Sequence, residues 1–231
     1  MTDTWRDALA VLPLERPHDP GGRVLVLSAH PDDEVLAVGA WLACQTARPI
    51  AFVTATDGEA SHPESTSVTS EELRERRPRE LIDALSRLGF TDPEVHRLGL
   101  PDGGLTTARD DLRDSLEPLV RAADLVLAPF ESDGHPDHDV LGEVARELCA
   151  DGPALWRFPI WTWVWTTPTD EPWLPSARRL VAAPAARDLK RRALDAFVTQ
   201  VRAVGVDAGD AAVVDDALLR HATEAPEVVV V

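Results

Sequence analysis

Two short clusters of polar side chains contain the residue types that bind metals and transfer protons. The first reads Ala-His-Pro-Asp-Asp-Glu at residues 29–34, and the second reads His-Pro-Asp-His at residues 135–138. A catalytic zinc ion typically takes three protein ligands from histidine and carboxylate and keeps one position for water, whose pKa it lowers to about 7. Two histidines and one aspartate satisfy such a site. The remaining carboxylates and histidine are then free to transfer protons.

The places of the two clusters relative to predicted strands support this interpretation. Residues 23–28 and 124–130 are short apolar runs that predict buried strands, and each cluster follows one of them. Helical patterns over residues 34–46 and 139–150 come next. In an open α/β sheet this is the carboxyl edge, where ligands bind. An Asp-rich turn alone can be a helix N-cap, and a His-x-x-His pair alone is often no metal site, but together they favour a shared centre.

The rest of the chain alternates between predicted strands and helices, which favours an α/β sandwich with a mostly parallel sheet. Further strands are expected at residues 49–54, 94–98, 156–166, 178–183 and 227–231, and further helices at residues 70–88, 107–122 and 185–203. Residues 1–22 are expected to be a lead-in, and residues 205–225 predict no definite element. A length of 231 residues suits a single domain over residues 1–231.

Three tryptophans alternate within the strand expected at residues 156–166. On a strand, Trp161, Trp163 and Trp165 share one face. The simpler interpretation is a core or a subunit interface. The alternative is an aromatic wall that packs on a sugar or on a lipophilic substrate.

Composition narrows the classes of partner. The formal net charge is −17, with 40 acidic and 23 basic residues, so we expect no nucleic acid and no anionic membrane surface as partners. Cys44 and Cys149 belong to no CxxC pair, which argues against a disulfide framework. Residues 1–16 lack a signal-peptide pattern, and no apolar run has the length of a membrane span. We therefore expect a cytoplasmic protein without membrane insertion, and a homo-oligomer is left open.

The sequence resembles the PIG-L/LmbE-like deacetylase family, which includes GlcNAc-phosphatidylinositol, mycothiol-pathway and glycopeptide-antibiotic deacetylases. Besides the two clusters, the resemblance includes the stretches at residues 53–59, 77–81, 88–89 and 100–103, and it covers residues 22–200. It implies a Rossmann-like three-layer sandwich and a Zn²⁺ cofactor. It also implies hydrolysis of an amide, by de-N-acetylation of a small-molecule N-acetylated amino sugar or glycoconjugate, with secondary metabolism as one setting.

The resemblance implies a role for each residue in the two clusters. His30, Asp33 and His138 are the zinc ligands by this resemblance. Asp32 is the general base that acts on the attacking water. His135 is the general acid, or it stabilises the tetrahedral oxyanion alongside the metal.

Residues outside the clusters are less clearly assigned. The resemblance implies that Arg77 contacts the substrate and that Asp102 is a weaker candidate for binding substrate hydroxyls. Some members carry a tyrosine before the second cluster that helps to hold the oxyanion, but this chain has no tyrosine. Many members have a histidine near the end of the last long helix, where this chain reads Phe-Val-Thr-Gln at residues 197–200.

Three further polar residues have simple expected places. Glu34 either orients His30 or is a carboxylate at a helix start. We expect Glu59 to be exposed to solvent on its polar loop, and His62 to lie on the surface.

Two other functions compete with the deacetylase. The abundant carboxylates suit a phosphoesterase that uses Mg²⁺ or Mn²⁺, but magnesium prefers oxygen ligands and two histidines argue against it. A metal-binding or sugar-binding domain without hydrolase activity is the non-enzymatic alternative, and the missing tyrosine keeps it open.

Overall fold

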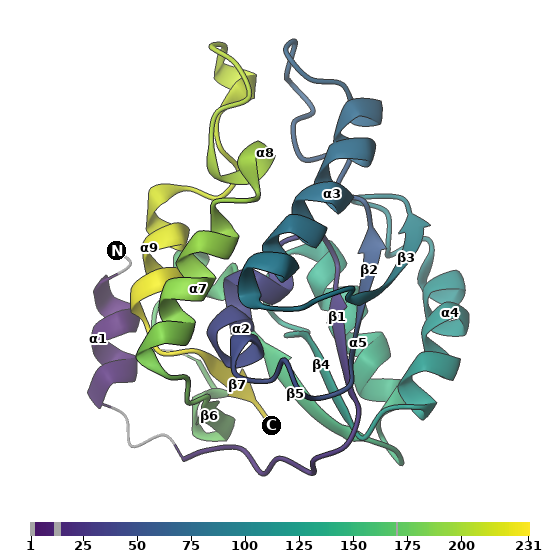
Figure 1. Ribbon diagram of the computed structural model, residues 1–231, viewed down its shortest axis with the longest axis vertical. Coiled ribbons are helices and arrows are strands. Elements are labelled where there is room, and N and C mark those ends of the chain that lie inside the picture. The colour runs from purple at the N-terminus through teal and green to yellow at the C-terminus, as the bar shows by residue number, and fades with distance from the viewer. Residues whose placement is uncertain (1–2, 12–14, 170) are drawn as a thin grey trace.

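A seven-stranded sheet runs through the molecule in a computed structural model that describes residues 3–11, 15–169 and 171–231 (Figure 1). The strand order is β3-β2-β1-β4-β5-β7-β6. The strands are β1 (Val24–Ser28), β2 (Ile50–Thr56), β3 (Glu94–Leu100), β4 (Leu125–Pro129), β5 (Ala154–Phe158), β6 (Ala177–Arg179) and β7 (Val228–Val230). Strands β1 to β5 are parallel, and β7 pairs antiparallel with β5 and β6. The predicted mostly parallel sheet is confirmed.

Helices cover both faces of this sheet. On one face lie α2 (Asp33–Ala43), α3 (Ser70–Leu88) and α7 (Pro184–Leu194), and on the other lie α4 (Arg109–Arg121) and α5 (Pro136–Leu148) (Figure 1). Side chains of β1 alternate between the two apolar layers, so Val26 packs on one side and Leu27 on the other. Burial on both faces explains the continuous apolar run. The Rossmann-like three-layer sandwich is confirmed.

Helix α3 has the bounds that the sequence predicts. Thr69 and Glu72 form a capping box at its start, in which each side chain bonds to the other residue's backbone N–H. Gly89 ends the helix in a left-handed conformation with φ of 103°. Pro78 lies inside the helix and does not end it.

The chain reverses its direction of progress across the sheet between β1 and β4. It runs outward from β1 through β2 to β3, then returns to place β4 on the other side of β1. The connections that leave the carboxyl ends of β1 and β4 therefore diverge, which opens a crevice where α/β proteins bind ligands. Each polar cluster follows one of these strand ends. The first lies between β1 and the start of α2 at Asp33, and the second lies at the start of α5 at Pro136, after β4.

The prediction of a strand over residues 156–166 is wrong for the second half of this range. β5 ends at Phe158, and the short helix α6 (Thr162–Trp165) follows. The rings of Trp161 and Trp165 stack at 4.7 Å, whereas Trp163 is buried and packs edge-on against Trp5 at 5.1 Å. The three tryptophans therefore do not share one face, because residues four apart, rather than two apart, are neighbours on a helix.

The last long helix is also broken. The range 185–203 holds α7 and the short α8 (Val198–Val201). The buried Phe197 between them has φ of −79° and ψ of 59°, which is not helical. The backbone N–H and the hydroxyl of Thr199 both donate to the carboxylate of Glu80 on α3, so a tertiary contact fixes the break.

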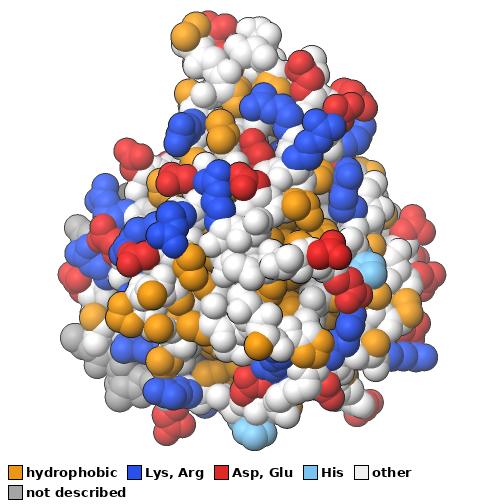
Figure 2. Space-filling model, viewed as in Figure 1, with side chains coloured by type: hydrophobic (Ala, Val, Ile, Leu, Met, Phe, Trp, Pro, Cys, Tyr) orange, Lys and Arg blue, Asp and Glu red, His pale blue; other side chains and the backbone are white. Residues whose placement is uncertain are grey.

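Further short elements lie where the sequence predicted none. They are α1 (Asp3–Val11), the 3-10 helices η1 (Leu174–Ser176) and η2 (Ala208–Asp210), and α9 (Asp216–Glu224). Among the described residues, no helix has the length and apolar character needed to cross a bilayer. Acidic and basic side chains are interspersed on the face shown in Figure 2, so the acidic excess does not form one patch there. Cys44 and Cys149 are both free thiols.

Candidate functional site

The turn between β1 and α2 places His30 beside Asp33. The backbone N–H of His30 donates to Oδ2 of Asp33 at 2.9 Å. The backbone N–H and the hydroxyl of Thr56 on β2 both donate to the carbonyl of Ala29, which ties the turn to the neighbouring strand. From the end of β4, the first turn of α5 carries His138 toward the same place.

His30, Asp33 and His138 converge on one point at the carboxyl edge of the sheet. Nε2 of His138 lies 3.4 Å from Nδ1 of His30 and 3.2 Å from Oδ1 of Asp33, and Nδ1 of His30 lies 3.8 Å from Oδ2 of Asp33. Ligand atoms about 2 Å from a tetrahedral zinc ion lie about 3.3 Å from one another. The distance between the two ring nitrogens is close to this value, and the two distances to Asp33 involve different oxygens of its carboxylate. Ligand atoms of His30, His135 and His138, and of His30, Asp102 and Asp137, also lie within 4.8 Å of one another, so the cluster could hold a metal ion around His30.

Each of the two histidines has a buried carboxylate at its other ring nitrogen. Asp133 Oδ2 lies 2.8 Å from Nδ1 of His138, and Asp102 Oδ1 lies 3.1 Å from Nε2 of His30, with Asp137 Oδ2 at 3.5 Å. A carboxylate that accepts from one ring nitrogen fixes the proton there and leaves the lone pair of the other nitrogen free. When a metal displaces the second proton of each ring, Nδ1 of His30 and Nε2 of His138 would offer it their lone pairs from 3.4 Å apart.

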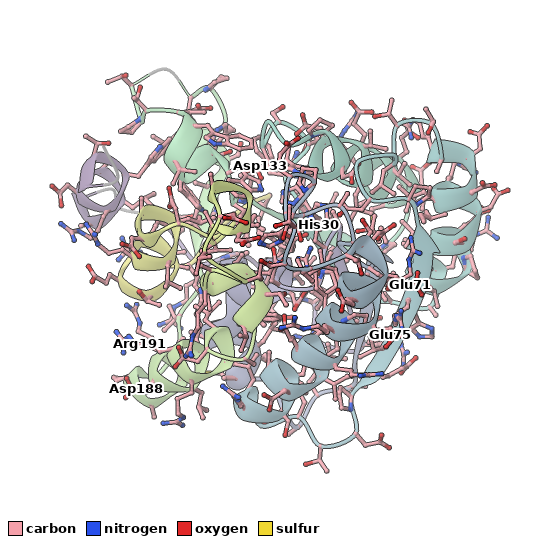
Figure 3. The ribbon with its side chains drawn as sticks, turned by 90° about the horizontal axis from the view of Figure 1, so that it is seen from above. His30, Glu71, Glu75, Asp133, Asp188 and Arg191 are labelled. Carbon is pink, nitrogen blue, oxygen red and sulfur yellow. The ribbon has the colours of Figure 1, made fainter. Side chains whose placement is uncertain are left out.

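Asp133 is fully buried between β4 and α5, and it was not among the residues predicted from the sequence. Its carboxylate also accepts the backbone N–H groups of Ile160, Trp161 and Thr162 at 2.8, 3.0 and 3.0 Å. It therefore caps α6 from 28 residues away. The one available signal was its place in the same strand-end turn as His135. Figure 3 shows Asp133 and His30 near the centre of the molecule, seen from above.

Asp32 lies next to this cluster and pairs with Arg77 of α3. Arg77 Nη2 lies 3.2 Å from Asp32 Oδ2, and both side chains are buried. Burial raises the pKa of Asp32 to about 6, although the positive charge of Arg77 opposes the rise. Arg77 Nη1 also donates to the carbonyl of Gly58 at 2.7 Å. Gly58 has φ of +69°, and a Cβ there would collide with the guanidinium of Arg77, so only glycine suits this position.

His135 caps the start of α5 and faces the cluster. Its Nδ1 accepts the backbone N–H of Asp137 at 3.3 Å. Burial, together with the charges of His138 and His30, lowers the pKa of His135 to about 4. The ring is therefore neutral at pH 7, and its proton is on Nε2.

Opposite charges inside the cluster shift the other pKa values. Burial alone would raise the pKa of Asp33, but the positive charges of His138 and His30 outweigh burial and lower it. Burial alone would lower the pKa of His30, but hydrogen bonds to Asp102 and Asp137 and the charge of Asp33 raise it to about 9. Such mutual dependence of carboxylates and imidazoles marks a site that a cation can share.

A cavity of about 260 Å³ opens onto the cluster. Six of the residues predicted from sequence line it, namely His30, Asp32, Asp33, Arg77, Asp102 and His135, while His138 is fully buried behind them. The loop before α3 and the loop after α8 rise together above the sheet (Figure 1). The hydroxyls of Ser65 and Ser67 donate to the two oxygens of Asp210 at 2.6 and 2.7 Å, which joins the loops.

A family profile described as PIG-L, GlcNAc-PI de-N-acetylase, matches residues 25–149, which is more than half of the chain. The chain belongs to the PIG-L family.

Curated relatives of this PIG-L chain carry deacetylase names. The 1D-myo-inositol 2-acetamido-2-deoxy-alpha-D-glucopyranoside deacetylase 1 of Frankia casuarinae is 33% identical over 162 residues, covering 57% of this chain and 52% of that protein. The probable N-acetyl-alpha-D-glucosaminyl L-malate deacetylase 2 of Bacillus subtilis is 33% identical over 134 residues, covering 54% of this chain and 60% of that protein. The chain spans about half the length of the curated relatives it matches.

Solved structures share the PIG-L fold. The N,N'-diacetylchitobiose deacetylase from Pyrococcus horikoshii has a TM-score of 0.63 and 22% identity, covering 83% of this chain and 75% of that one. The conserved protein TT1542 from Thermus thermophilus has a TM-score of 0.55 and 26% identity, covering 77% of this chain and 79% of that one.

Two of three polar residues in this PIG-L chain lie elsewhere than the sequence predicts. Glu34 fulfils the second of its two expected places, a carboxylate at a helix start, because it lies in the first turn of α2, where it accepts from the hydroxyl of Ser28 at 2.6 Å and makes no described contact with His30. Glu59 is buried rather than exposed, because it binds Arg74 at 3.0 Å beside the cavity. His62 is also buried rather than on the surface.

Proposed function

We propose that this chain is a zinc-dependent amide hydrolase that removes the acetyl group from an N-acetylated amino sugar or glycoconjugate. The observation that carries the proposal is the convergence of His30, Asp33 and His138 beside the buried Asp32. The names of the relatives support the substrate class, because those proteins are named as deacetylases of compounds that contain N-acetylglucosamine or a related sugar. The fold shared with a teicoplanin deacetylase makes secondary metabolism one setting.

His30, Asp33 and His138 would hold the zinc ion in this proposal. Imidazole and carboxylate suit zinc, and Asp133 and Asp102 keep both imidazoles in the tautomer that binds a metal. When bound, zinc polarises the acyl carbonyl and makes water acidic enough to attack near neutral pH. Two imidazoles in the donor set favour zinc over Mg²⁺, which weighs against the phosphoesterase alternative.

Asp32 would move the proton. As the water oxygen bonds to the acyl carbon, Asp32 takes a proton from the water. It then passes this proton to the amide nitrogen while the carbon–nitrogen bond breaks, which gives acetate and a free amine. A carboxyl group whose pKa lies at about 6 is suited to both steps at neutral pH. Arg77 lies 3.2 Å from the carboxylate of Asp32 and would hold it in place. This role would come in addition to contact with the substrate.

His135 would donate a hydrogen bond to the oxyanion. Because Nδ1 accepts the N–H of Asp137, the neutral ring presents an Nε2–H donor. The lowered pKa argues for this role over that of a general acid, since a group with a pKa of about 4 is seldom protonated at pH 7. His135 would thereby serve where other members use a tyrosine.

Acetate release from a panel of N-acetylated sugars and glycoconjugates tests the proposal. Zinc-loaded protein should release acetate from at least one compound, and Asp32→Asn should abolish release while the protein stays folded. Absence of release across the panel from zinc-loaded, folded protein would instead favour a metal-binding or sugar-binding domain without hydrolase activity.

A further inference from the structure

Part of the active-site cavity is apolar, and Trp161 is its largest member. The apolar residues that line the cavity are Leu36, Ala60, Ile160, Trp161, Val213 and Val214. The ring of Trp161 is nearly parallel to the ring of His135, with an interplanar angle of 22° and 6.4 Å between centroids. An aromatic surface therefore begins directly beside the residue that faces the reacting amide.

Trp161 is held firmly from two directions. Trp165 stacks on it at 4.7 Å and 15°, although Trp165 itself is 55% exposed. Its backbone N–H donates to Asp133 at 3.0 Å, and the same carboxylate holds His138. The position of the indole is thereby fixed relative to the metal-binding side chains. Gly134 allows the His135 loop to approach, since a Cβ there would lie 3.3 Å from the ring of Trp165.

The cavity also offers polar groups that the hydrolytic steps do not use. Ser61 and Gln200 line it, and Gln200 Nε2 lies 3.3 Å from the hydroxyl of Ser61. The same hydroxyl lies 3.0 Å from Nδ1 of the buried His62. A side-chain amide and a hydroxyl of this kind suit the hydroxyl groups of a ligand.

We propose that Trp161, braced by Trp165, is a specificity-determining platform that packs against the C–H face of a pyranose ring whose hydroxyl groups face Ser61 and Gln200. This inference rests on the proposed function, because it places the scissile amide at the metal-binding side chains and His135. The sugar ring bonded to the amide nitrogen then lies beside His135, on the side where the indole of Trp161 is. A pyranose has both apolar faces and polar edges, and so matches a cavity with both kinds of lining.

Substrate selectivity tests the platform. We compare kcat/KM for methyl 2-acetamido-2-deoxyglucopyranoside with that for the acyclic N-acetylethanolamine. Trp161→Ala should lower the ratio of the two values about tenfold, the effect of losing one aromatic contact. Trp161→Phe should recover most of the ratio, and Trp165→Ala should lower it about threefold, because the brace is lost but the contact remains. Val181→Ala, at a residue that is 50% exposed and outside the cavity, is the control and should change nothing.

A binding measurement separates this inference from the hydrolytic proposal. Calorimetric titration with the pyranoside should show that zinc-loaded Asp32→Asn protein binds it. The double variant that also carries Trp161→Ala should bind it about tenfold more weakly. Binding of this kind without acetate release by the wild type would overturn the hydrolytic proposal and support the platform. The platform would be overturned if the ratio stayed within twofold of the wild-type value in both Trp161→Ala and Trp165→Ala. This includes the case in which kcat/KM falls equally for both compounds, because an equal fall indicates a merely structural role.

Discussion

Nδ1 of His138 lies 2.8 Å from Oδ2 of Asp133, and both side chains are fully buried. The same carboxylate accepts three backbone N–H groups from residues 160–162. Asp133 therefore connects a candidate metal ligand to the segment that carries Trp161. The site depends on this residue in two ways, through the orientation of His138 and through the placing of the cavity wall.

Replacing Asp133 should weaken metal binding. Asp133→Asn keeps the size of the side chain but removes the charge that holds the proton on Nδ1 of His138. Loss of such a partner typically lowers metal affinity about 10- to 100-fold. Competition with a zinc chelator measures the affinity, and circular dichroism checks the fold. Asp151→Asn, at an exposed position, is the matched control. Wild-type affinity in the folded Asp133→Asn protein would contradict the role given to Asp133.

The two neighbouring aspartates of the first cluster should behave differently. Asp32→Asn should retain zinc and lose activity at least about 100-fold, because a proton carrier is removed and a ligand is not. Asp33→Asn should lose zinc, since Asp33 Oδ1 lies 3.2 Å from Nε2 of His138 in the converging set. Metal analysis beside acetate release distinguishes the two. The reverse pattern, with zinc lost in Asp32→Asn and kept in Asp33→Asn, would exchange their roles.

Removing Arg77 should move the pH profile. Asp32 must be ionised to accept a proton, so kcat/KM falls as the pH drops through its pKa. Burial raises this pKa and the charge of Arg77 opposes the rise. Arg77→Met removes that opposition, so the acid limb of kcat/KM should move to higher pH, and Arg77→Lys should move it less. An acid limb at the same pH in all three proteins would show that Arg77 does not act on Asp32.

His221 should make the protein less stable in acid. Burial, with the charge of Lys190, lowers the pKa of His221 to about 3, and its ring stacks on Trp163 at 4.6 Å. The unfolded chain therefore binds a proton that the folded protein does not, and stability is lost as the pH falls from about 6.5 toward 3. At pH 5 the loss is up to about 2 kcal/mol of the free energy of unfolding.

Urea unfolding of His221→Phe at pH 7 and pH 5 isolates this contribution. Phenylalanine keeps an aromatic ring against Trp163 and cannot be protonated, so the variant should lose less stability between the two pH values than the wild type. Other titrating groups affect both proteins alike. Equal losses in the two proteins would show that His221 does not have the lowered pKa.

Local signals were sufficient for the elements that place the metal-binding side chains. The apolar run of β1 and the capping box of α3 at Thr69 and Glu72 are both readable in the sequence. The positions of His30 and His138 at two strand ends follow from the same patterns. Their convergence within 3.4 Å then follows from the order of the strands, which places β1 beside β4.

Contacts between distant residues decide what the sequence could not predict. The alternation of Trp161, Trp163 and Trp165 is typical of a strand, but the carboxylate of Asp133 caps this segment as a helix. No glycine or proline marks the break between α7 and α8, which depends on Thr199 binding Glu80. The burial of Glu59 and His62 likewise depends on how the loop before α3 packs, rather than on its polar composition.

Titration of metal-free protein with zinc, while acetate release is followed, tests the central claim most directly. The stripped protein should be inactive, and activity should rise linearly and stop rising at about one zinc ion per chain. His30→Ala, which removes one of the converging nitrogens, should show neither tight binding nor activity. Full activity in the stripped protein, or zinc binding that His30→Ala leaves unchanged, would contradict the account.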